Sequence, residues 1–199
     1  HVEGGVDPLR DADVIETELM LADLESLQKR QVNLGKKAKG GDKEAKAQLE
    51  IIEPILAALE DGKAARTVEF DPTRMKEVKA LQLLTTKPIL YLCNVEEAAA
   101  ATGNEHSAKV AEKAKTEGAA CVVISAAIEA EVAQLDAEEK AEYLDSMGLE
   151  EPGLTRLIRA GYELLDLLTF FTVGPKEARA WTVRNGAKAP EAAGAIHTD

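Results

Sequence analysis

The stretch Ile89-Leu90-Tyr91-Leu92-Cys93 decides the fold class, because an uninterrupted apolar run is typical of a strand buried on both faces. A second run of the same kind is Ala120-Cys121-Val122-Val123-Ile124. Residues 106–116, which lie between the two runs, have a helical pattern. A buried strand, a helix and a second buried strand predict a parallel βαβ unit and an α/β fold.

Two helices joined by a glycine-rich turn are predicted ahead of this unit. Apolar residues recur with helical spacing over residues 11–34 and 42–59. In the second helix the steps alternate between four and three, which is the pattern of a coiled-coil seam. We expect the helix to break at Gly35 and the chain to reverse over residues 35–41, and we expect Pro54 to bend the second helix.

The rest of the chain carries further helix and hairpin signals. Asp71-Pro72 predicts a helix that runs to Leu84. The acidic residues 129–150 are predicted to be helical, with a capping-box-like start at Asp136 and Glu139 and a stop at Gly148. Residues 154–167 are predicted to form another helix. Two β-type runs on either side of Gly174-Pro175 predict a β-hairpin, with an Ala- and Gly-rich tail behind it.

Composition limits the class of protein. The 199 residues hold 24 Lys+Arg and 36 Asp+Glu, a net charge of −12, and 45% of them are hydrophobic, which is an ordinary globular mixture. The acidic balance argues against indiscriminate nucleic-acid binding but allows a local basic patch. No apolar run reaches the ~20 residues that a membrane helix needs, so we expect no membrane partner.

The cysteines and histidines indicate no metal site. Cys93 and Cys121 lie inside the apolar runs without metal-ligand spacing, so we expect reduced, buried thiols and a cytoplasmic location. The three histidines are scattered along the sequence. The chain begins at His1 without Met, which indicates the interior of a longer protein.

Polar residues end both predicted strands. Asn94-Val95-Glu96-Glu97 follows the first strand and Ser125-Ala126-Ala127 follows the second. Ligands of parallel sheets bind at such strand ends, an Asn side chain both donates and accepts, and a carboxylate three residues on can accept from a base N–H. The pattern fits nucleobase recognition. The alternative is that Asn94 caps a turn, that the glutamates begin a helix and that the small residues form a simple turn.

A basic cluster lies at the turn between the two predicted helices. It reverses the sign of an acidic chain, and a projecting basic tip suits contact with RNA phosphates. A solvated loop that lysines keep soluble is the other interpretation. The residues that we expect to contact RNA or a protein partner are Lys36, Lys37, Lys39 and Lys43.

Nearly the whole chain resembles the Obg-like ATPase family, the YchF/EngD branch of the P-loop GTPase-like proteins. The most specific stretch is Leu168-Thr169-Phe170-Phe171-Thr172-Val173-Gly174-Pro175-Lys176-Glu177, with Arg179-Ala180-Trp181-Thr182 behind it. The other matching stretches are His1-Val2-Glu3-Gly4, Val6-Asp7-Pro8, residues 18–25, the lysine-rich turn, residues 87–91 with the Asn94 motif, residues 157–162 and residues 194–199.

The resemblance implies a GTPase-like core with an inserted coiled-coil hairpin, followed by a TGS domain, which is a small β-grasp module. Phe170 and Trp181 would then belong to the β-grasp core. The implied segments are the end of an N-terminal core part (1–10), the coiled-coil hairpin (11–70), the C-terminal half of the core (71–165) and an incomplete TGS domain (166–199).

The resemblance also implies a nucleotide site. The family's fourth motif is Asn-x-x-Glu, a change associated with ATP being preferred to GTP or accepted beside it. Asn94 and Glu97 would read the base with the Val95 backbone alongside, and Ser125, Ala126 and Ala127 would pack over it. Guanine offers N1–H and N2–H₂ to the Asp of ordinary GTPases, whereas a longer Glu moves the carboxylate and adenine offers only its amino group there.

One departure from the family decides what the chain can do alone. No Gly-x-x-x-x-Gly-Lys-Ser/Thr segment is present, so phosphate cradle and Mg²⁺ ligands are missing and no catalytic residue is assigned. We expect the whole protein, favoured as a monomer, to hydrolyse ATP, possibly GTP, with Mg²⁺ and to bind the ribosome or RNA, and this chain alone to be inactive. The alternative is a non-catalytic interaction module that uses the basic tip and the β-grasp surface.

Overall fold

The computed structural model describes residues 5–196, which form two compact units. The first unit ends at Pro88 and the second begins at Ile89. The fold is mixed α/β. The stretch His1-Val2-Glu3-Gly4 and the last three residues of the stretch 194–199, which carry part of the resemblance, lie outside the described residues. No helix of residues 5–196 is long and apolar enough to cross a membrane.

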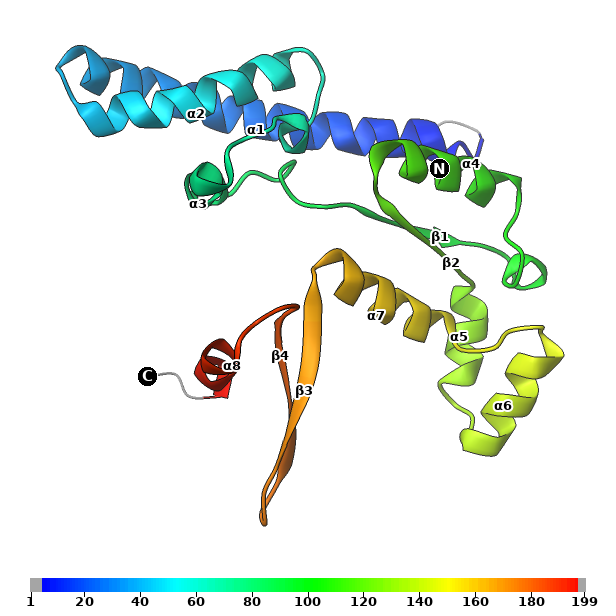
Figure 1. Cartoon of the computed structure of the whole chain (residues 1–199). Helices are drawn as coiled ribbons and strands as arrows, with labels where there is room; N and C mark the ends of the chain where they lie inside the picture. Colours follow the sequence, from blue (N-terminus) through cyan, green and yellow to red (C-terminus); the bar gives the residue numbers. More distant parts are fainter. Residues whose placement is uncertain (1–4, 197–199) are drawn as a thin grey trace. The chain divides into compact units, whose positions relative to one another are not determined.

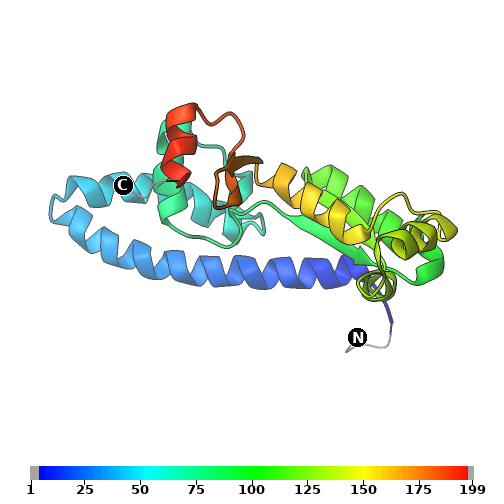
Figure 2. The same ribbon diagram turned by 90° about the horizontal axis from the view of Figure 1, so that it is seen from below.

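The first unit is built on two long helices that pack side by side. In Figures 1 and 2, α2 runs back along the C-terminal part of α1, as expected of a helical hairpin. A 3₁₀ helix, a second 3₁₀ helix and a short α3 follow. The bounds are α1 Pro8–Lys39, α2 Lys43–Glu60, 3₁₀ helices Ala65–Thr67 and Pro72–Arg74, and α3 Met75–Ala80.

Capping residues set the ends of both helices. The Asp7 side chain accepts from the Arg10 N–H, and Pro8 opens α1 at a position where the missing N–H costs nothing. The predicted break at Gly35 is wrong, because α1 continues to Lys39 and the chain turns only at Gly40 and Gly41. Leu34 packs partly buried on the core, which holds this last part of α1 in the helix. Pro54 does not end α2.

The core of the first unit lies between α1, α2 and the segment that follows them. Ile52 and Ile55 of α2 and Leu27 of α1 are fully buried there. Each such side chain contributes about 1.5–3 kcal/mol by leaving water. The other buried members are Ile51, Leu56, Leu59, Ala65, Val78 and Leu83.

A buried carboxylate joins α1 to the end of the first unit. Asp23 is only 3% exposed, and its Oδ1 accepts from the Leu84 N–H at 2.8 Å. Its Oδ2 accepts from the N–H of Thr85 at 2.8 Å and from its hydroxyl at 2.7 Å. The Thr85 hydroxyl oxygen in turn accepts from the Ala65 N–H at 3.1 Å. One carboxylate therefore fixes three segments that are far apart in the sequence.

This network explains why α3 is shorter than predicted. A helix running to Leu84 is wrong, because α3 ends at Ala80 and Gln82 has a positive φ of 56°. Backbone N–H groups of residues 84 and 85 donate to Asp23 and are not available to a helix. The long-range bonds to the carboxylate replace the local helical ones.

We expect Asp23→Ala to destabilise the first unit by about 3 kcal/mol, because it leaves two buried donors of Thr85 and the partly buried Leu84 N–H without an acceptor. Urea unfolding followed by far-UV circular dichroism measures the loss. Glu18→Ala, an exposed acid of the same helix, is the matched control. The single tryptophan, Trp181, reports on the second unit, and its fluorescence transition should not move. Equal urea midpoints for the two variants would contradict a structural role of Asp23.

The second unit holds the strands. Its α-helices and strands are β1 Leu90–Asn94, α4 Glu105–Glu117, β2 Ala120–Ile124, α5 Ala126–Val132, α6 Ala137–Ser146, α7 Gly153–Leu164, β3 Leu167–Val173, β4 Ala178–Arg184 and α8 Ala189–Ile196. A 3₁₀ helix covers Glu97–Ala99.

The predicted βαβ unit is confirmed. β1 and β2 pair in parallel, with Tyr91 opposite Cys121 and Asn94 opposite Ile124. α4 and α7 lie on opposite sides of the strands (Figure 1). Successive side chains of a strand point to opposite faces, and Val123 lies near Gly103, just before α4, while Ile124 lies against Gly153 of α7. The strands are thus sandwiched as in an α/β fold.

The helical region predicted over residues 129–150 is confirmed, and two helices occupy it. α5 already begins at Ala126, and α6 starts with a capping box between Asp136 and Glu139. The Glu129 carboxylate accepts from the N–H groups of Gly153 and Leu154 at 2.6 and 3.1 Å, so a side chain of α5 caps α7. This cap replaces the one that Pro152 cannot supply.

The predicted β-hairpin is confirmed as the antiparallel pair of β3 and β4. Phe170 and Trp181 face each other and are partly buried, as expected for core residues, while Phe171 on the other face is 73% exposed. The Tyr162 hydroxyl of α7 lies within hydrogen-bond distance of the Thr169 and Thr182 hydroxyls. The Ala- and Gly-rich tail forms α8, which packs against β4.

Candidate functional site

Parallel pairing brings the two predicted motifs to one end of the β1–β2 sheet. Because Asn94 is opposite Ile124, the residues that follow each strand leave the sheet side by side. The Asn94 Oδ1 accepts from the Ala126 N–H at 2.9 Å. The Val95 N–H donates to the Ile124 carbonyl at 2.8 Å and prolongs the pairing by one step. Two motifs that lie far apart in the sequence are therefore joined by hydrogen bonds.

The orientation of the Asn94 amide determines what it can offer to a ligand. Oδ1 is engaged by Ala126, whereas Nδ2 has no partner within residues 5–196, and the side chain is exposed. A free amide donor at a strand end can bind a purine N7, which is an acceptor in adenine and guanine alike. Ala126 and Ala127, whose side chains are single methyl groups, are exposed.

Ser125 and Val95, the other two predicted residues at these strand ends, are buried. Ser125 is 3% exposed, and its hydroxyl has no partner within the described part of the chain. The Val95 N–H is used by the Ile124 carbonyl, so of its backbone groups only the carbonyl remains for a ligand.

Glu97 opens the 3₁₀ helix behind β1 and is exposed. Its neighbour Glu96 accepts from the Asn104 side chain at 3.0 Å and supports the N-terminus of α4. The sequence did not predict that α6 reaches this region. The Tyr143 hydroxyl donates to Glu131, and this hydrogen bond, desolvation and the negative charges of Glu131 and Glu97 raise the pKa of Tyr143 to about 12. Glu97 thus lies in an acidic environment.

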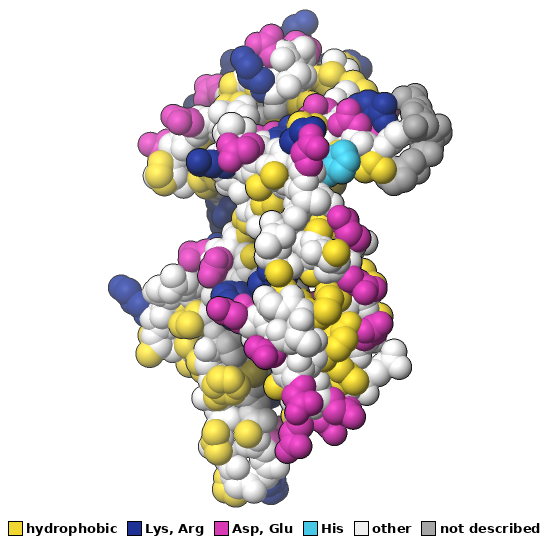
Figure 3. Space-filling view, turned by 90° about the vertical axis from the view of Figure 1, so that its right-hand side faces the viewer, with side chains coloured by type: hydrophobic (Ala, Val, Ile, Leu, Met, Phe, Trp, Pro, Cys, Tyr) yellow, Lys and Arg dark blue, Asp and Glu magenta, His cyan; other side chains and the backbone are white. Residues whose placement is uncertain are grey.

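The predicted basic cluster lies at the tip of the helical hairpin. Lys36, Lys37 and Lys39 are in the last turn of α1, where positive charge interacts favourably with the helix dipole, and Lys43 is the first residue of α2. All four side chains are exposed. No ion pair involves them within residues 5–196. Figure 3 shows a face of the molecule that carries many Asp and Glu side chains. In a chain with a net charge of −12, the lysine cluster is a local reversal of charge.

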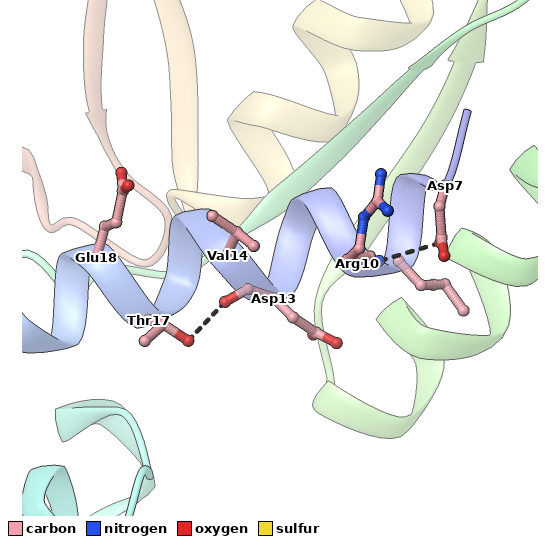
Figure 4. A pocket seen from close by; sticks show the side chains of 7 residues that line it. Asp7, Arg10, Asp13, Val14, Thr17 and Glu18 are labelled. Atoms are coloured by element: carbon pink, nitrogen blue, oxygen red, sulfur yellow. Dashed lines mark hydrogen bonds between the residues drawn. The ribbon is translucent and has the colours of Figure 1, made fainter. Parts of the chain in front are cut away.

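A surface hollow at the start of α1 is a third place to consider as a ligand site (Figure 4). Its lining runs from Asp7 to Glu18, all of it from α1 or the residue before it. The labelled side chains point to both sides of the helix and do not converge. It has none of the convergent polar groups of a ligand site. Within residues 5–196 no group of three metal-ligating side chains is found.

Comparisons with known proteins bear on the fold and on the site. The chain is 52% identical to the ribosome-binding ATPase YchF of Haemophilus influenzae and 49% identical to that of Bacillus subtilis, and both alignments cover the whole chain. Over its whole length, the chain is similar to YchF proteins. It spans 54% and 55% of these two relatives, about half of their length.

Two further comparisons agree with the YchF family. A family model described as YchF-GTPase_C, a protein of unknown function (DUF933), matches residues 167–199. The structure of the Schizosaccharomyces pombe YchF GTPase matches the whole chain with a TM-score of 0.86 and 33% identity, over 55% of that structure. The Obg-like resemblance is therefore confirmed.

The position of Glu97 can be tested through Tyr143. Since the pKa of Tyr143 is raised above its ordinary value of 10, its hydrogen bond stabilises the fold fully below pH 10 and is lost as the pH rises through about 12. Glu131→Gln should lower this pKa most, and Glu97→Gln should lower it less. NMR titration of the tyrosine rings measures both shifts. Glu112→Gln on α4 is the control, and an unchanged pKa in Glu97→Gln would place Glu97 away from Tyr143.

Proposed function

We propose that this chain supplies the base-binding half of a nucleotide site in a protein that hydrolyses ATP, and possibly GTP, with Mg²⁺. Asn94, Glu97 and the Val95 backbone contact the base edge, and Ser125, Ala126 and Ala127 form the surface under the ring. The hydrogen bond from the Ala126 N–H to Asn94 Oδ1 carries this proposal. It holds Oδ1 at Ala126 and leaves Nδ2 as the donor for a ligand.

The phosphate-binding half must come from residues outside this chain, which has no Gly-x-x-x-x-Gly-Lys-Ser/Thr segment. Similarity to proteins named ribosome-binding ATPase and GTPase supports a P-loop NTPase as the whole protein. We therefore expect the chain alone to be inactive, because its sequence lacks the motif that holds Mg²⁺ and the transferred phosphoryl group.

Asn94→Ala is expected to weaken ATP binding about 10- to 100-fold, the effect of losing one hydrogen bond to the base and the bond that positions it. The measurement is a titration with fluorescent ATP and GTP analogues in a full-length family member that carries these residues. Asn185→Ala, an exposed residue behind β4, is the matched control. Unchanged ATP affinity in Asn94→Ala would refute the base site, and clear GTP preference would refute the role given to Glu97.

A second activity is supported by the lysines at the hairpin tip. We propose that Lys36, Lys37, Lys39 and Lys43 contact ribosomal RNA phosphates, with the helical hairpin acting as a projecting coiled-coil arm of a cytoplasmic protein. Relatives named ribosome-binding support the partner, and the exposed unpaired lysines support the surface. The competing function is an interaction module that acts without nucleotide through this tip and the exposed face of the β3–β4 hairpin.

Charge reversal separates a binding tip from a solvated loop. The triple variant of Lys36, Lys37 and Lys39 to Glu should lose most ribosome binding and flatten its salt dependence, because each phosphate contact releases counterions. Reversal of Lys76, Lys79 and Lys87, also exposed in the first unit, changes the net charge equally and is the control. Co-sedimentation with ribosomes at several salt concentrations gives the answer, and equal binding by both variants would exclude the tip.

A further inference from the structure

The two cysteines of the chain lie side by side on the β1–β2 sheet. Their Sγ atoms are 3.9 Å apart. Cys93 is opposite Val123 and Cys121 is opposite Tyr91, so the two residues are diagonal neighbours on one face. It is the face toward α4, because Tyr91 on the same face donates through its hydroxyl to Glu117 of that helix at 2.7 Å. The strand register thus holds two thiols in contact.

The surroundings of the two cysteines leave them accessible and keep Cys93 protonated at neutral pH. The sequence predicted buried thiols, but both are only half-buried, so small molecules can reach them. Desolvation, followed by the neighbouring Cys121, raises the pKa of Cys93 to about 11. The resting form at neutral pH is therefore a pair of thiols that share a weak S–H···S contact, and not a reactive thiolate.

We propose that Cys93 and Cys121 are a modification site that hydrogen peroxide converts into a disulfide, which a dithiol can reverse. One sulfur attacks the peroxide, the O–O bond breaks, and a sulfenic acid and water form. The second sulfur then attacks the sulfenic sulfur, the S–O bond breaks, and a second water leaves with the remaining thiol proton. Two thiols lose two electrons, the peroxide gains two, and a dithiol restores the reduced pair by exchange.

The disulfide acts on the strand ends. Disulfides join Cα atoms usually 4.4–6.8 Å apart, whereas diagonal neighbours on adjacent strands lie about 7–8 Å apart. Closing the bond therefore draws β1 and β2 along each other. Asn94 follows Cys93 directly, so the movement strains its bond to the Ala126 N–H. This regulatory step rests on the proposed base site, whereas disulfide formation does not.

The test uses the full 199-residue chain, whose only two cysteines make the assignment unambiguous. Dilute chain is treated with hydrogen peroxide, denatured and alkylated, and the labels are counted by mass spectrometry. We expect a monomeric disulfide that dithiothreitol reverses, with less dimedone-trapped sulfenic acid per disulfide in the folded chain than in urea, because the second sulfur is held next to the first. Cys93→Ala and Cys121→Ala should stop at a sulfenic acid that dimedone traps. No disulfide, or the same ratio of sulfenic acid to disulfide in folded and unfolded chain, would overturn the site.

Amide hydrogen exchange tests the coupling without nucleotide. Oxidation should speed exchange at Ala126, whose N–H donates to Asn94, and leave Thr85 in the first unit unchanged. A disulfide with an unaltered Ala126 amide would overturn the regulatory step and keep the modification site. Failure of ATP binding in the full-length protein would remove the proposed function while both of these readouts stay as predicted.

Discussion

The parallel register of β1 and β2 is the constraint on which the rest of the second unit depends. It sets Asn94 opposite Ile124, so that the Asn94 side-chain amide at the end of β1 lies at hydrogen-bond distance from the Ala126 N–H at the start of α5. A slip of one residue would turn every side chain of a strand to the other face. The same register places Cys93 next to Cys121. Binding surface and thiol pair therefore follow from one set of backbone bonds.

The first unit depends on a different kind of interaction. Apolar packing between α1 and α2 is not directional and does not fix the path of the chain after α2. The Asp23 carboxylate fixes it, because its acceptor oxygens match particular N–H groups at positions 84 and 85. A buried carboxylate in a helix is costly unless it is fully hydrogen-bonded, and here the bonds also position the segment that leads to the second unit.

Local patterns in the sequence predicted most elements, since they are written in consecutive residues. The apolar runs gave β2 with its observed bounds and β1 within one residue, and the capping box at Asp136 gave the start of α6. The errors at Gly35 and Leu84 have one cause. In both places contacts with distant residues outweigh the local signal, since Leu34 packs on the core and Asp23 captures the backbone.

The candidate site divides in the same way. Position along the strands indicated Asn94 and the residues after Ile124, because strand ends can be located from the sequence. The positions of Tyr143 and Glu131 beside Glu97, and the cap that Glu129 provides for α7, depend on how α5 and α6 fold back. No residue spacing in the sequence indicates that α5 and α6 fold back in this way.

In the proposed base site, Asn94 Oδ1 and Nδ2 have different partners, and this affects which base is preferred. With Oδ1 held by Ala126, the amide meets a purine through Nδ2 alone, and N7 is the same acceptor in both purines. Asn94 can then secure affinity but not discrimination. Discrimination must come from groups that meet position 6 or position 2 of the ring. At position 6 adenine donates and guanine accepts, and at position 2 only guanine donates. A carboxylate such as Glu97 accepts only, so its reach, and not its charge, decides which purine it favours.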